Sequence, residues 1–184
     1  MASQPMAEQL AAIRSASAAD ASAVAGIYAH HVAHGTASFD TDPRSEQETA
    51  ARIAQCDAHG WPFLVAERDG KVVGYAYATQ FRDRPAYRST CENSIYIAPS
   101  HVGQGIGGQL LAALIDAAAE AGFRQMIAVI GGAEPASVAL HRGAGFVEAG
   151  RMRSVGRKFG RWLDTLYMQR PLGAGDSEAP VVEP

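Results

Sequence analysis

The sequence predicts a mixed α/β domain built on one twisted sheet, and three observations support this prediction. Apolar residues recur at helical intervals over residues 106–118, which is typical of a helix that covers a sheet. Residues 126–130 are continuously apolar, which indicates a strand buried on both faces in the middle of the sheet. Asp69-Gly70 separates two runs with strand character, which indicates a β-hairpin. The predicted elements follow the order β-α-α-β-β-β-α-β-α-β-β.

The amino-terminal part is predicted to hold a short strand and two helices. The strand ends near Arg14, and Asp20 is expected to cap a helix that continues to about residue 32. Ser45 and Glu48 form a capping-box pair, which predicts a second helix from there to about residue 59. The first helix is expected to bury one stripe of side chains, formed by Val24, Ile27, Tyr28 and His31.

Three strands are predicted in the middle of the chain, at residues 63–68, 71–81 and 91–98. Pro99 ends the third strand, because proline cannot donate to a strand ladder. Side chains alternate between the two faces of a strand. The second strand is therefore expected to place Val73, Tyr75 and Tyr77 on one face.

The carboxyl-terminal part begins with a glycine-rich turn, residues 102–108, and a long helix that ends near Gly122. A short helix is predicted at residues 135–143. Strands at residues 146–155 and 162–169 follow, joined by a basic turn at residues 156–160, and Trp162 is expected to belong to the core. The long helix is expected to bury Ile106, Leu110, Leu111, Leu114, Ile115 and Ala118.

Length and composition favour a single folded domain at residues 11–172. Residues 1–10 are expected to form a flexible tail, and residues 173–184, rich in Gly, Pro and acidic residues, a disordered one. The 184 residues carry a formal net charge of −3. This charge argues against a nucleic-acid partner, because nucleic-acid-binding domains are usually basic.

Neither a membrane span nor a disulfide framework is indicated. No apolar run approaches the roughly 18 residues that cross a bilayer, and the first residues lack the basic and apolar regions of a signal peptide. We therefore expect no membrane partner and a cytoplasmic location. Cys56 and Cys91 lie far apart in the sequence, and we expect two reduced, partly buried thiols in preference to a catalytic Cys91.

A strand that leads into a glycine-rich turn and then a helix, residues 94–108, is the most informative stretch. Free N–H groups and the helix dipole attract anions at a helix start, and glycine lets the backbone approach them closely. We therefore expect a phosphate or pyrophosphate site here; the alternative is a connector that binds nothing.

Two other phosphate-binding motifs compete for this stretch. A P-loop is excluded, because Gly107-Gly108 is followed by Gln109 instead of Lys and then Ser or Thr. A dinucleotide fingerprint is formally matched by Gly103, Gly105 and Gly108. It is kept as a second alternative, although strands and helices do not alternate from the start of the chain as such domains require.

Residues 102–107 resemble the pyrophosphate loop of the GNAT acetyltransferases, and residues 137–146 resemble that family's second cofactor segment, with its terminal Gly-Phe. Val102 departs from the Gln or Arg of that loop, and Glu134 from the Asn that usually precedes the second segment. The resemblance implies acetyl-CoA as co-substrate, no metal, and the GNAT (acyl-CoA N-acyltransferase) fold. In that fold a single twisted, mostly antiparallel sheet with flanking helices is splayed at its central strands, here beside residues 95–97. The cofactor contacts implied are Ile95, Tyr96, Ile97, Val102, Gly103, Gln104, Gly105, Ile106, Gly107 and Glu134.

Four segments resemble, more narrowly, the phosphinothricin and methionine sulfoximine or sulfone acetyltransferases of that family. They are residues 27–30 with 36–39, residues 90–97, residues 137–141, and residues 155–164. The likeness implies direct acetyl transfer to the α-amino group of a small amino-acid-like substrate, and a homodimer. It implies an acceptor pocket lined by Tyr28, Phe39, Phe81, Arg82 and Asp83. Arginine in the loop after residue 81 suits a substrate carboxylate.

Two titratable residues are the candidates for catalysis. Glu92 matches the family's acidic position and would accept a proton from the attacking amine, directly or through water; the alternative is a solvated glutamate at a strand end. His141 is expected to protonate the departing thiolate or to hydrogen-bond within the site; the alternative is a partly buried structural histidine. His30 and His34 have metal-ligand spacing on a helix, but no third ligand accompanies them, so we expect surface histidines.

Three other functions remain open from the sequence. One is a GNAT enzyme that acetylates another amine, such as a polyamine or a protein terminus; an acidic pocket would favour a polyamine. Another is a non-catalytic acyl-CoA-binding module, in which Glu92 and His141 would face away from the thioester. The third is a dinucleotide oxidoreductase, which titration with the cofactors would distinguish. Fold alone does not fix the acceptor.

Overall fold

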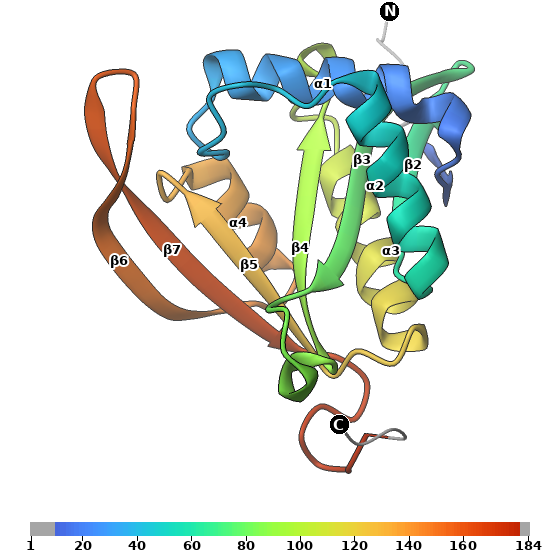
Figure 1. Cartoon of the computed structure of the whole chain (residues 1–184), viewed down its shortest axis with the longest axis vertical. Coiled ribbons are helices and arrows are strands. Elements are labelled where there is room, and N and C mark those ends of the chain that lie inside the picture. Colours follow the sequence, from blue (N-terminus) through green and yellow to red (C-terminus); the bar gives the residue numbers. More distant parts are fainter. Residues whose placement is uncertain (1–9, 181–184) are drawn as a thin grey trace, which may run out of the picture.

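The computed structural model describes residues 10–180 and shows one seven-stranded sheet flanked by helices (Figure 1). The strand order is β1-β2-β3-β4-β5-β7-β6, and every neighbouring pair is antiparallel except β4 and β5. The mixed α/β fold predicted from the sequence is therefore confirmed, in the predicted order of elements. The strands are β1 (Ala12–Ser15), β2 (Phe63–Arg68), β3 (Lys71–Gln80), β4 (Thr90–Ile97), β5 (Gln125–Gly131), β6 (Val147–Lys158) and β7 (Arg161–Pro171).

Four helices cover the two faces of the sheet: α1 (Ala21–His34), α2 (Glu46–His59), α3 (Ile106–Glu120) and α4 (Pro135–Gly143). Helices α1 and α2 pack on the face of β2, β3 and β4 that carries Tyr75, Tyr77 and Tyr96. Helices α3 and α4 cover the opposite face. The apolar stripe predicted for α3 is buried throughout. A dinucleotide-binding domain is excluded, because it needs a mostly parallel sheet and here one pair of strands is parallel.

The starts of α1 and α2 differ in how they are capped. The predicted capping box of α2 is present: Ser45 Oγ accepts from the Glu48 N–H, and Glu48 accepts from the Ser45 N–H at 2.8 Å. Asp20 precedes α1 as predicted, but its carboxylate accepts from Arg14 and Ser17 instead of from the helix. Asp20 is therefore the N-cap residue of α1 as predicted, but its side chain does not cap the helix, because Arg14 on β1 lies close enough to bind the carboxylate.

A β-bulge in β3 overturns one prediction about its faces. Ala66 and Glu67 of β2 pair with Gly74 and Val72 of β3, so Val73 is an extra residue in the ladder. Val73 is consequently buried against the face that α3 covers, whereas Tyr75 and Tyr77 lie on the opposite face. Strict alternation of side chains predicted Val73, Tyr75 and Tyr77 on the same face. The extra residue turns the Val73 side chain to the other face.

The central strands β4 and β5 separate after four residue pairs. Their ladder runs from Thr90 opposite Gln125 to Asn93 opposite Ala128 and ends there. Beyond Asn93, β4 continues beside β3 as far as Ile97, while β5 continues beside β7. The resulting wedge-shaped opening, which we call the splay, is the one that the family resemblance implied, and it is visible as the gap between β4 and β5 (Figure 1).

Strands β6 and β7 form a long hairpin that extends away from the helices (Figure 1). Its turn is Phe159-Gly160, shorter than the predicted turn at residues 156–160, and both residues have positive φ. Trp162 is 61% exposed, so its predicted place in the core is wrong. The ring belongs to the second residue of β7, next to the turn of the hairpin, and the Arg157 guanidinium lies 5.7 Å from its centroid.

The predicted tails fall partly outside the described chain. Residues 1–9 and 181–184 lie outside the described residues, and residues 173–178 form turns with hydrogen bonds from Gly175 N to Leu172 O and Ser177 N to Ala174 O. None of the helices within residues 10–180 combines the length and apolar character needed to cross a membrane. In the same part of the chain, no three His, Cys, Asp or Glu side chains are grouped as metal ligands.

Candidate active site

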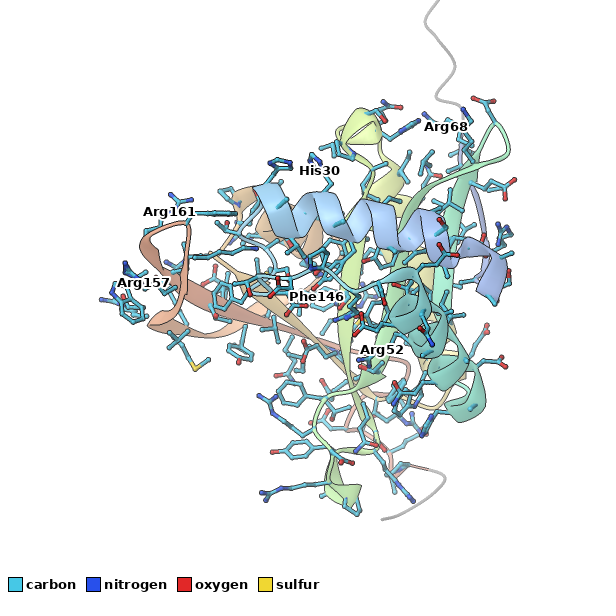
Figure 2. The ribbon with its side chains drawn as sticks, turned by 45° about the horizontal axis from the view of Figure 1, so that its top comes forward. His30, Arg52, Arg68, Phe146, Arg157 and Arg161 are labelled. Carbon is cyan, nitrogen blue, oxygen red and sulfur yellow. The ribbon has the colours of Figure 1, made fainter. Side chains whose placement is uncertain are left out.

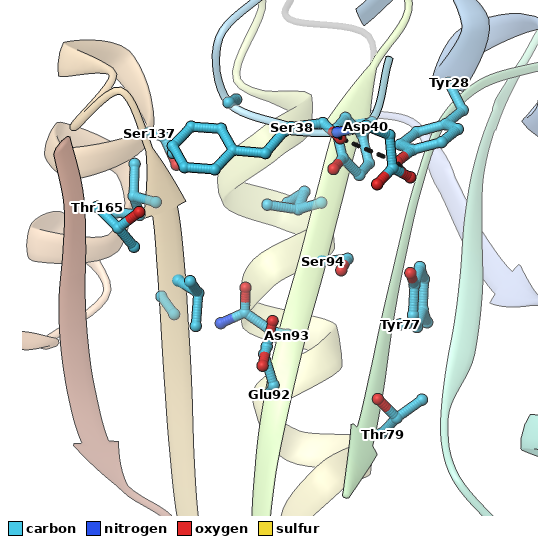
Figure 3. Close-up of a pocket in the computed structure, with 18 of the residues that line it drawn as sticks. Tyr28, Ser38, Asp40, Tyr77, Thr79, Glu92, Asn93, Ser94, Ser137 and Thr165 are labelled. Atoms are coloured by element: carbon cyan, nitrogen blue, oxygen red, sulfur yellow. Dashed lines mark hydrogen bonds between the residues drawn. The ribbon is translucent and has the colours of Figure 1, made fainter. Parts of the chain in front are cut away.

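A cavity of about 420 Å³ opens at the splay and reaches both faces of the sheet (Figure 3). Glu92, Ser94 and Tyr96 of β4 point toward the face that α1 and α2 cover. Asn93 and Ile95, which alternate with them, point toward the face of α3 and α4. Both sets line the cavity because β5 no longer closes the side of β4. The splay therefore joins two half-sites on opposite faces of one sheet.

Glu92 supplies the carboxylate of the first half-site. It is half-buried, and Thr79 of β3 lies opposite it in the ladder. Burial raises the pKa of the Glu92 carboxyl above its ordinary value, and the positive charge of Arg82 lowers it in part. A carboxylate whose pKa is raised is a stronger base in its ionised form.

His141 of α4 supplies the imidazole of the second half-site. Its side chain is 2% exposed, and Nδ1 lies 2.8 Å from the Ser137 carbonyl oxygen. The Nε2 atom lies 3.1 Å from Oδ1 of Asn93. Burial lowers the pKa of His141, and the hydrogen bond to Ser137 raises it in part. Both ring nitrogens therefore have protein partners, and the ring is biased toward its neutral form.

Asn93 connects His141 to the splay. It is the last residue of β4 that pairs with β5, and it is 6% exposed. Its amide nitrogen points from β4 toward β5 (Figure 3) and has no hydrogen-bond partner among the described residues. The sequence analysis did not select Asn93, because an asparagine in a strand carries no motif of its own.

The loop after α1, residues 37–40, lines the cavity and is held by hydrogen bonds from Tyr28 and from Lys158. The Tyr28 hydroxyl hydrogen-bonds Ser38 at 2.9 Å and donates a short hydrogen bond to Asp40. Lys158 at the end of β6 donates from Nζ to the Ser38 carbonyl oxygen at 2.8 Å. Burial, aided by Asp40, raises the pKa of Tyr28 to about 12, so the phenol stays protonated. The Phe39 ring packs against Gly156, where a Cβ would stand 2.2 Å from the ring.

The predicted acceptor residues separate into two groups. Tyr28, Phe39 and Phe81 line the cavity. Arg82 and Asp83 are exposed and outside its lining; the Arg82 guanidinium lies 4.4 Å from the centroid of the Phe81 ring. Arg82 influences the site electrostatically, because its positive charge lowers the pKa of Glu92.

Two arginines that the sequence analysis missed line the cavity instead. Arg44 donates to the Tyr77 hydroxyl at 3.2 Å and lies 4.8 Å from the centroid of the Tyr28 ring. Arg52 is half-buried on the side of α2 toward the central strands (Figure 2), and within the described residues no hydrogen bond or ion pair engages it. A usable signal was present in the sequence, since Arg52 falls on the stripe of α2 that buries Thr49, Ile53 and Cys56.

The start of α3 meets the requirements of a pyrophosphate site. Gly105 is its N-cap, with φ 76°, and no side chain caps the helix. Gly103 has φ 79°, and a Cβ there would meet nothing within 4 Å. No acidic residue lies in the first turn. The first N–H groups of α3 are therefore available to an anion, which the helix dipole also attracts.

The remaining residues of the predicted cofactor set have distinct environments. Ile106 is 1% exposed and its side chain belongs to the core beneath α3. Gln104 accepts from Arg68 at 2.5 Å and donates to the Ser100 carbonyl oxygen. Glu134 caps α4 by accepting from the Ser137 N–H at 2.8 Å. Val102 is exposed, and Gly107 faces Leu140 of α4. Of the three β4 residues predicted to contact the cofactor, Ile95 and Tyr96 line the cavity and Ile97 does not.

Comparison with known proteins assigns this geometry to a family. A model of the acetyltransferase (GNAT) domain matches residues 13–167. The chain is 54% identical to a phosphinothricin N-acetyltransferase of Alcaligenes faecalis over 88% of this chain and 82% of that protein. It is 41% identical to an L-methionine sulfoximine/L-methionine sulfone acetyltransferase of Salmonella typhimurium, over 87% of this chain and 94% of that one.

Solved structures agree with the sequence comparisons. The fold is similar to that of a GNAT superfamily phosphinothricin acetyltransferase from Sinorhizobium meliloti in complex with AcCoA, with TM-score 0.92, 48% identity and 94% of each chain covered. A putative acetyltransferase from Salmonella typhimurium, solved with acetyl-CoA, gives TM-score 0.89 at 38% identity, over 94% of this chain and 98% of that one.

Proposed function

Since this chain belongs to the GNAT family and is an acetyl-CoA-dependent N-acetyltransferase, we propose that it acetylates the α-amino group of a small amino-acid analogue of the phosphinothricin and methionine sulfoximine or sulfone class. The relatives named above act on substrates of that class. The one observation that carries the proposal is the charge arrangement of the cavity, which has Glu92 on β4 and, on the side of α2, Arg44 paired with Asp40 and Arg52 without an ion-pair partner among the described residues.

That arrangement matches an amino acid, which carries an amine and a carboxylate on one carbon. Arg52 has no protein partner in the described chain and presents a planar set of donors, which suits a carboxylate. Arg44 adds positive charge on the same side. Glu92 lies on β4, where it would meet the amine. A diamine or polyamine would bring positive charge next to both arginines, which disfavours that alternative.

Glu92 is proposed as the general base. The amine nitrogen must lose a proton to form an amide, and the raised pKa of Glu92 suits it to accept that proton. The new C–N bond forms as the C–S bond of the thioester breaks, and the sulfur leaves as a thiolate that takes its proton from solvent. Glu92 faces the cavity, and this orientation also argues against a non-catalytic acyl-CoA-binding module.

The donor is proposed to bind on the other half-site. Free N–H groups at the start of α3 would hold the pyrophosphate, with Gly103 and Gly105 allowing close approach. The edge of β4 from Ser94 to Ile97 has no strand beside it on the splay side, so its main chain is open to an amide-containing arm. An N–H of this edge would then stabilise charge that develops on the thioester oxygen.

Two expectations accompany this function. We expect a cytoplasmic enzyme, because Cys56 and Cys91 are both free and buried, which suits a reducing compartment. We expect a homodimer, and the β6–β7 hairpin offers exposed apolar side chains for its contact, among them Met152, Phe159 and Trp162. Light scattering after gel filtration measures the oligomer directly.

The proposal is tested by measuring free-thiol release from acetyl-CoA against a panel of amines. The panel contains methionine sulfone, methionine sulfoximine, phosphinothricin, natural amino acids and spermidine. We expect the first three to give the largest kcat/KM, and spermidine to give none. Turnover confined to spermidine would overturn the proposal, as would the absence of turnover with phosphinothricin, methionine sulfoximine and methionine sulfone.

A further inference from the structure

The side-chain amide of Asn93 is a buried polar group without a complete set of partners, and it stands at the apex of the splay. One end of the amide contacts His141, and the other points toward β5 and meets no hydrogen-bonding atom of residues 10–180. Leaving such a group unsatisfied costs roughly 1–3 kcal/mol. Natural sites tolerate an unsatisfied buried group mainly where a ligand or water completes it.

The chemistry of His141 decides which end of the amide faces the splay. Nδ1 lies 2.8 Å from the Ser137 carbonyl oxygen, which can only accept, so Nδ1 carries a proton. No charged partner balances a buried imidazolium here, so the ring is neutral and Nε2 holds a lone pair. An Nε2 lone pair needs a donor, and within 3.1 Å the Asn93 amide is the group that provides one.

It follows that Asn93 gives its N–H to His141 and turns its carbonyl oxygen toward the splay. Amide oxygen and nitrogen are nearly identical in shape, and their assignment rests on the hydrogen bonds that each can make. In the orientation drawn, Oδ1 would face the lone pair of a neutral ring, which is repulsive. Rotating the amide by a half-turn removes this conflict and leaves a free acceptor at the apex of the splay.

We propose that Asn93 is a donor-binding residue whose carbonyl oxygen accepts a hydrogen bond from the amide N–H of the acetyl-CoA arm nearest the sulfur, and that His141 is a positioning residue that fixes the Asn93 amide. Asn93 lies on the face of the sheet that α3 and α4 cover, which is the side of the proposed pyrophosphate site. Glu92 and the two arginines lie toward the other face, so the acceptor amine is not the partner. The arm of acetyl-CoA contributes amide N–H groups and carries the last of them two carbons from the sulfur.

In this proposal His141 positions the Asn93 amide and does not protonate the departing thiolate. Its two nitrogens are held by Ser137 and Asn93, so neither is free toward the cavity. The inference rests on the use of acetyl-CoA and not on the identity of the acceptor. A failure of the amine panel would therefore leave it standing, and a failure of the binding experiments below would leave the panel result intact.

The tautomer is tested by nitrogen NMR of the imidazole rings in the full chain, with His141→Phe to assign the signals. We expect His141 to show a protonated Nδ1 and an unprotonated Nε2 at pH 7. In Asn93→Asp the carboxylate cannot donate to Nε2, and we expect the ring to become an imidazolium. An imidazolium in the unaltered protein, or a proton on Nε2 alone, would overturn the assigned orientation.

The binding role is tested by calorimetry with CoA, acetyl-CoA and adenosine 3′,5′-bisphosphate, which lacks the arm. One hydrogen bond corresponds to a change of about 2- to 10-fold in affinity. We expect Asn93→Leu to weaken CoA and acetyl-CoA by that factor and to leave the bisphosphate unchanged. Asn93→Asp keeps an acceptor oxygen at the splay and should bind CoA as tightly as the unaltered protein. Gln169→Met, an amide lost outside the cavity, is the matched control.

The outcomes separate the proposal from a purely structural role. Equal CoA affinity in Asn93→Leu would overturn it, as would an equal loss of bisphosphate binding, which would report a disturbed fold. A loss in Asn93→Asp as large as in Asn93→Leu would show that the amide donates to the ligand and would also overturn it. His141→Phe should weaken CoA binding in the presence of Asn93 and have no further effect in Asn93→Leu; independent effects would remove His141 from the positioning role.

Discussion

Lys158 at the end of β6 donates a hydrogen bond of 2.8 Å to the main-chain carbonyl oxygen of Ser38, 120 residues earlier in the chain. The side chain is buried, and burial lowers the pKa of the ammonium group, an effect that the charge of Asp40 opposes. Ser38 also hydrogen-bonds Tyr28, so this contact ties the β6–β7 hairpin to the acceptor half of the cavity.

Lys158→Met should therefore weaken acceptor binding without affecting the donor. A hydrogen bond from a charged group is worth about 1.5–3 kcal/mol, and part of this holds the loop of residues 36–40 over the cavity. We expect KM for the amino-acid substrate to rise about 10-fold, with CoA affinity unchanged by calorimetry. Lys71→Met, an exposed lysine in the β2–β3 hairpin, is the control. A rise in the dissociation constant for CoA would contradict this reading of the contact.

Glu92→Gln should lower kcat by ~10²-fold or more, because an amide cannot accept the proton of the amine. The pH dependence gives a second measurement. Burial raises the pKa of Glu92, so the rate of the unaltered enzyme should fall as the pH decreases through that raised pKa. Glu92→Gln should lose this acid limb of the kcat/KM profile. A variant that keeps both its rate and its acid limb would remove Glu92 from the reaction.

Arg52→Met should discriminate between acceptors that carry a carboxylate and those that do not. We expect KM for methionine sulfone to rise by about 10- to 100-fold, the range for losing a charge-assisted hydrogen bond. The decarboxylated analogue, 3-(methylsulfonyl)propylamine, should react equally poorly with both enzymes. Arg161→Met, at the outer end of the β6–β7 hairpin (Figure 2), removes the same charge at a distance. An equal effect on both acceptors would place Arg52 outside the carboxylate site.

Gly103→Ala should weaken the binding of CoA and of adenosine 3′,5′-bisphosphate alike. At φ 79° an alanine is strained by about 1–2 kcal/mol, and the loop should shift away from the geometry that offers its N–H groups. Gly60→Ala is a close control, because Gly60 has φ 67°, also meets nothing within 4 Å, and lies at the end of α2. We expect similar losses of thermal stability in both variants and a loss of nucleotide affinity in Gly103→Ala alone.

Asp20→Asn should destabilise the protein at neutral pH and not at low pH. The Arg14 guanidinium lowers the pKa of Asp20 to about 2. A depressed carboxyl pKa contributes stability that is complete above the unfolded value near 4 and is lost as the pH falls toward 2. Because Arg14 is partly exposed, we expect a difference of about 1–2 kcal/mol in the free energy of unfolding at pH 7. Urea titrations should show this difference shrinking below pH 4; a constant difference would exclude the ion pair as its source.

Local patterns in the sequence predicted most of the elements and the site for the donor. The stripe of α3, the capping box of α2 and the Asp69-Gly70 turn each depend on residues within a few positions of one another. The glycine turn at residues 102–108 is equally local, because a helix start and its dipole are properties of one segment. Such features are readable before folding, since the interactions that form them do not involve the rest of the chain.

The tertiary structure decided the features that depend on distant partners. One extra residue in β3 reversed Val73, and Trp162, at the start of β7 near the hairpin turn, stayed 61% exposed. Arg52 entered the cavity and Arg82 did not, because the position of α2 over β3 and β4 is set by packing. Asn93 became a site residue because β5 leaves β4 at that point, and His141 of α4 was brought against it from 48 residues away. The sequence by itself thus determined the fold and the proposed site for the donor, while the proposed acceptor site and the proposed role of His141 depend on contacts that form only when separate segments are brought together.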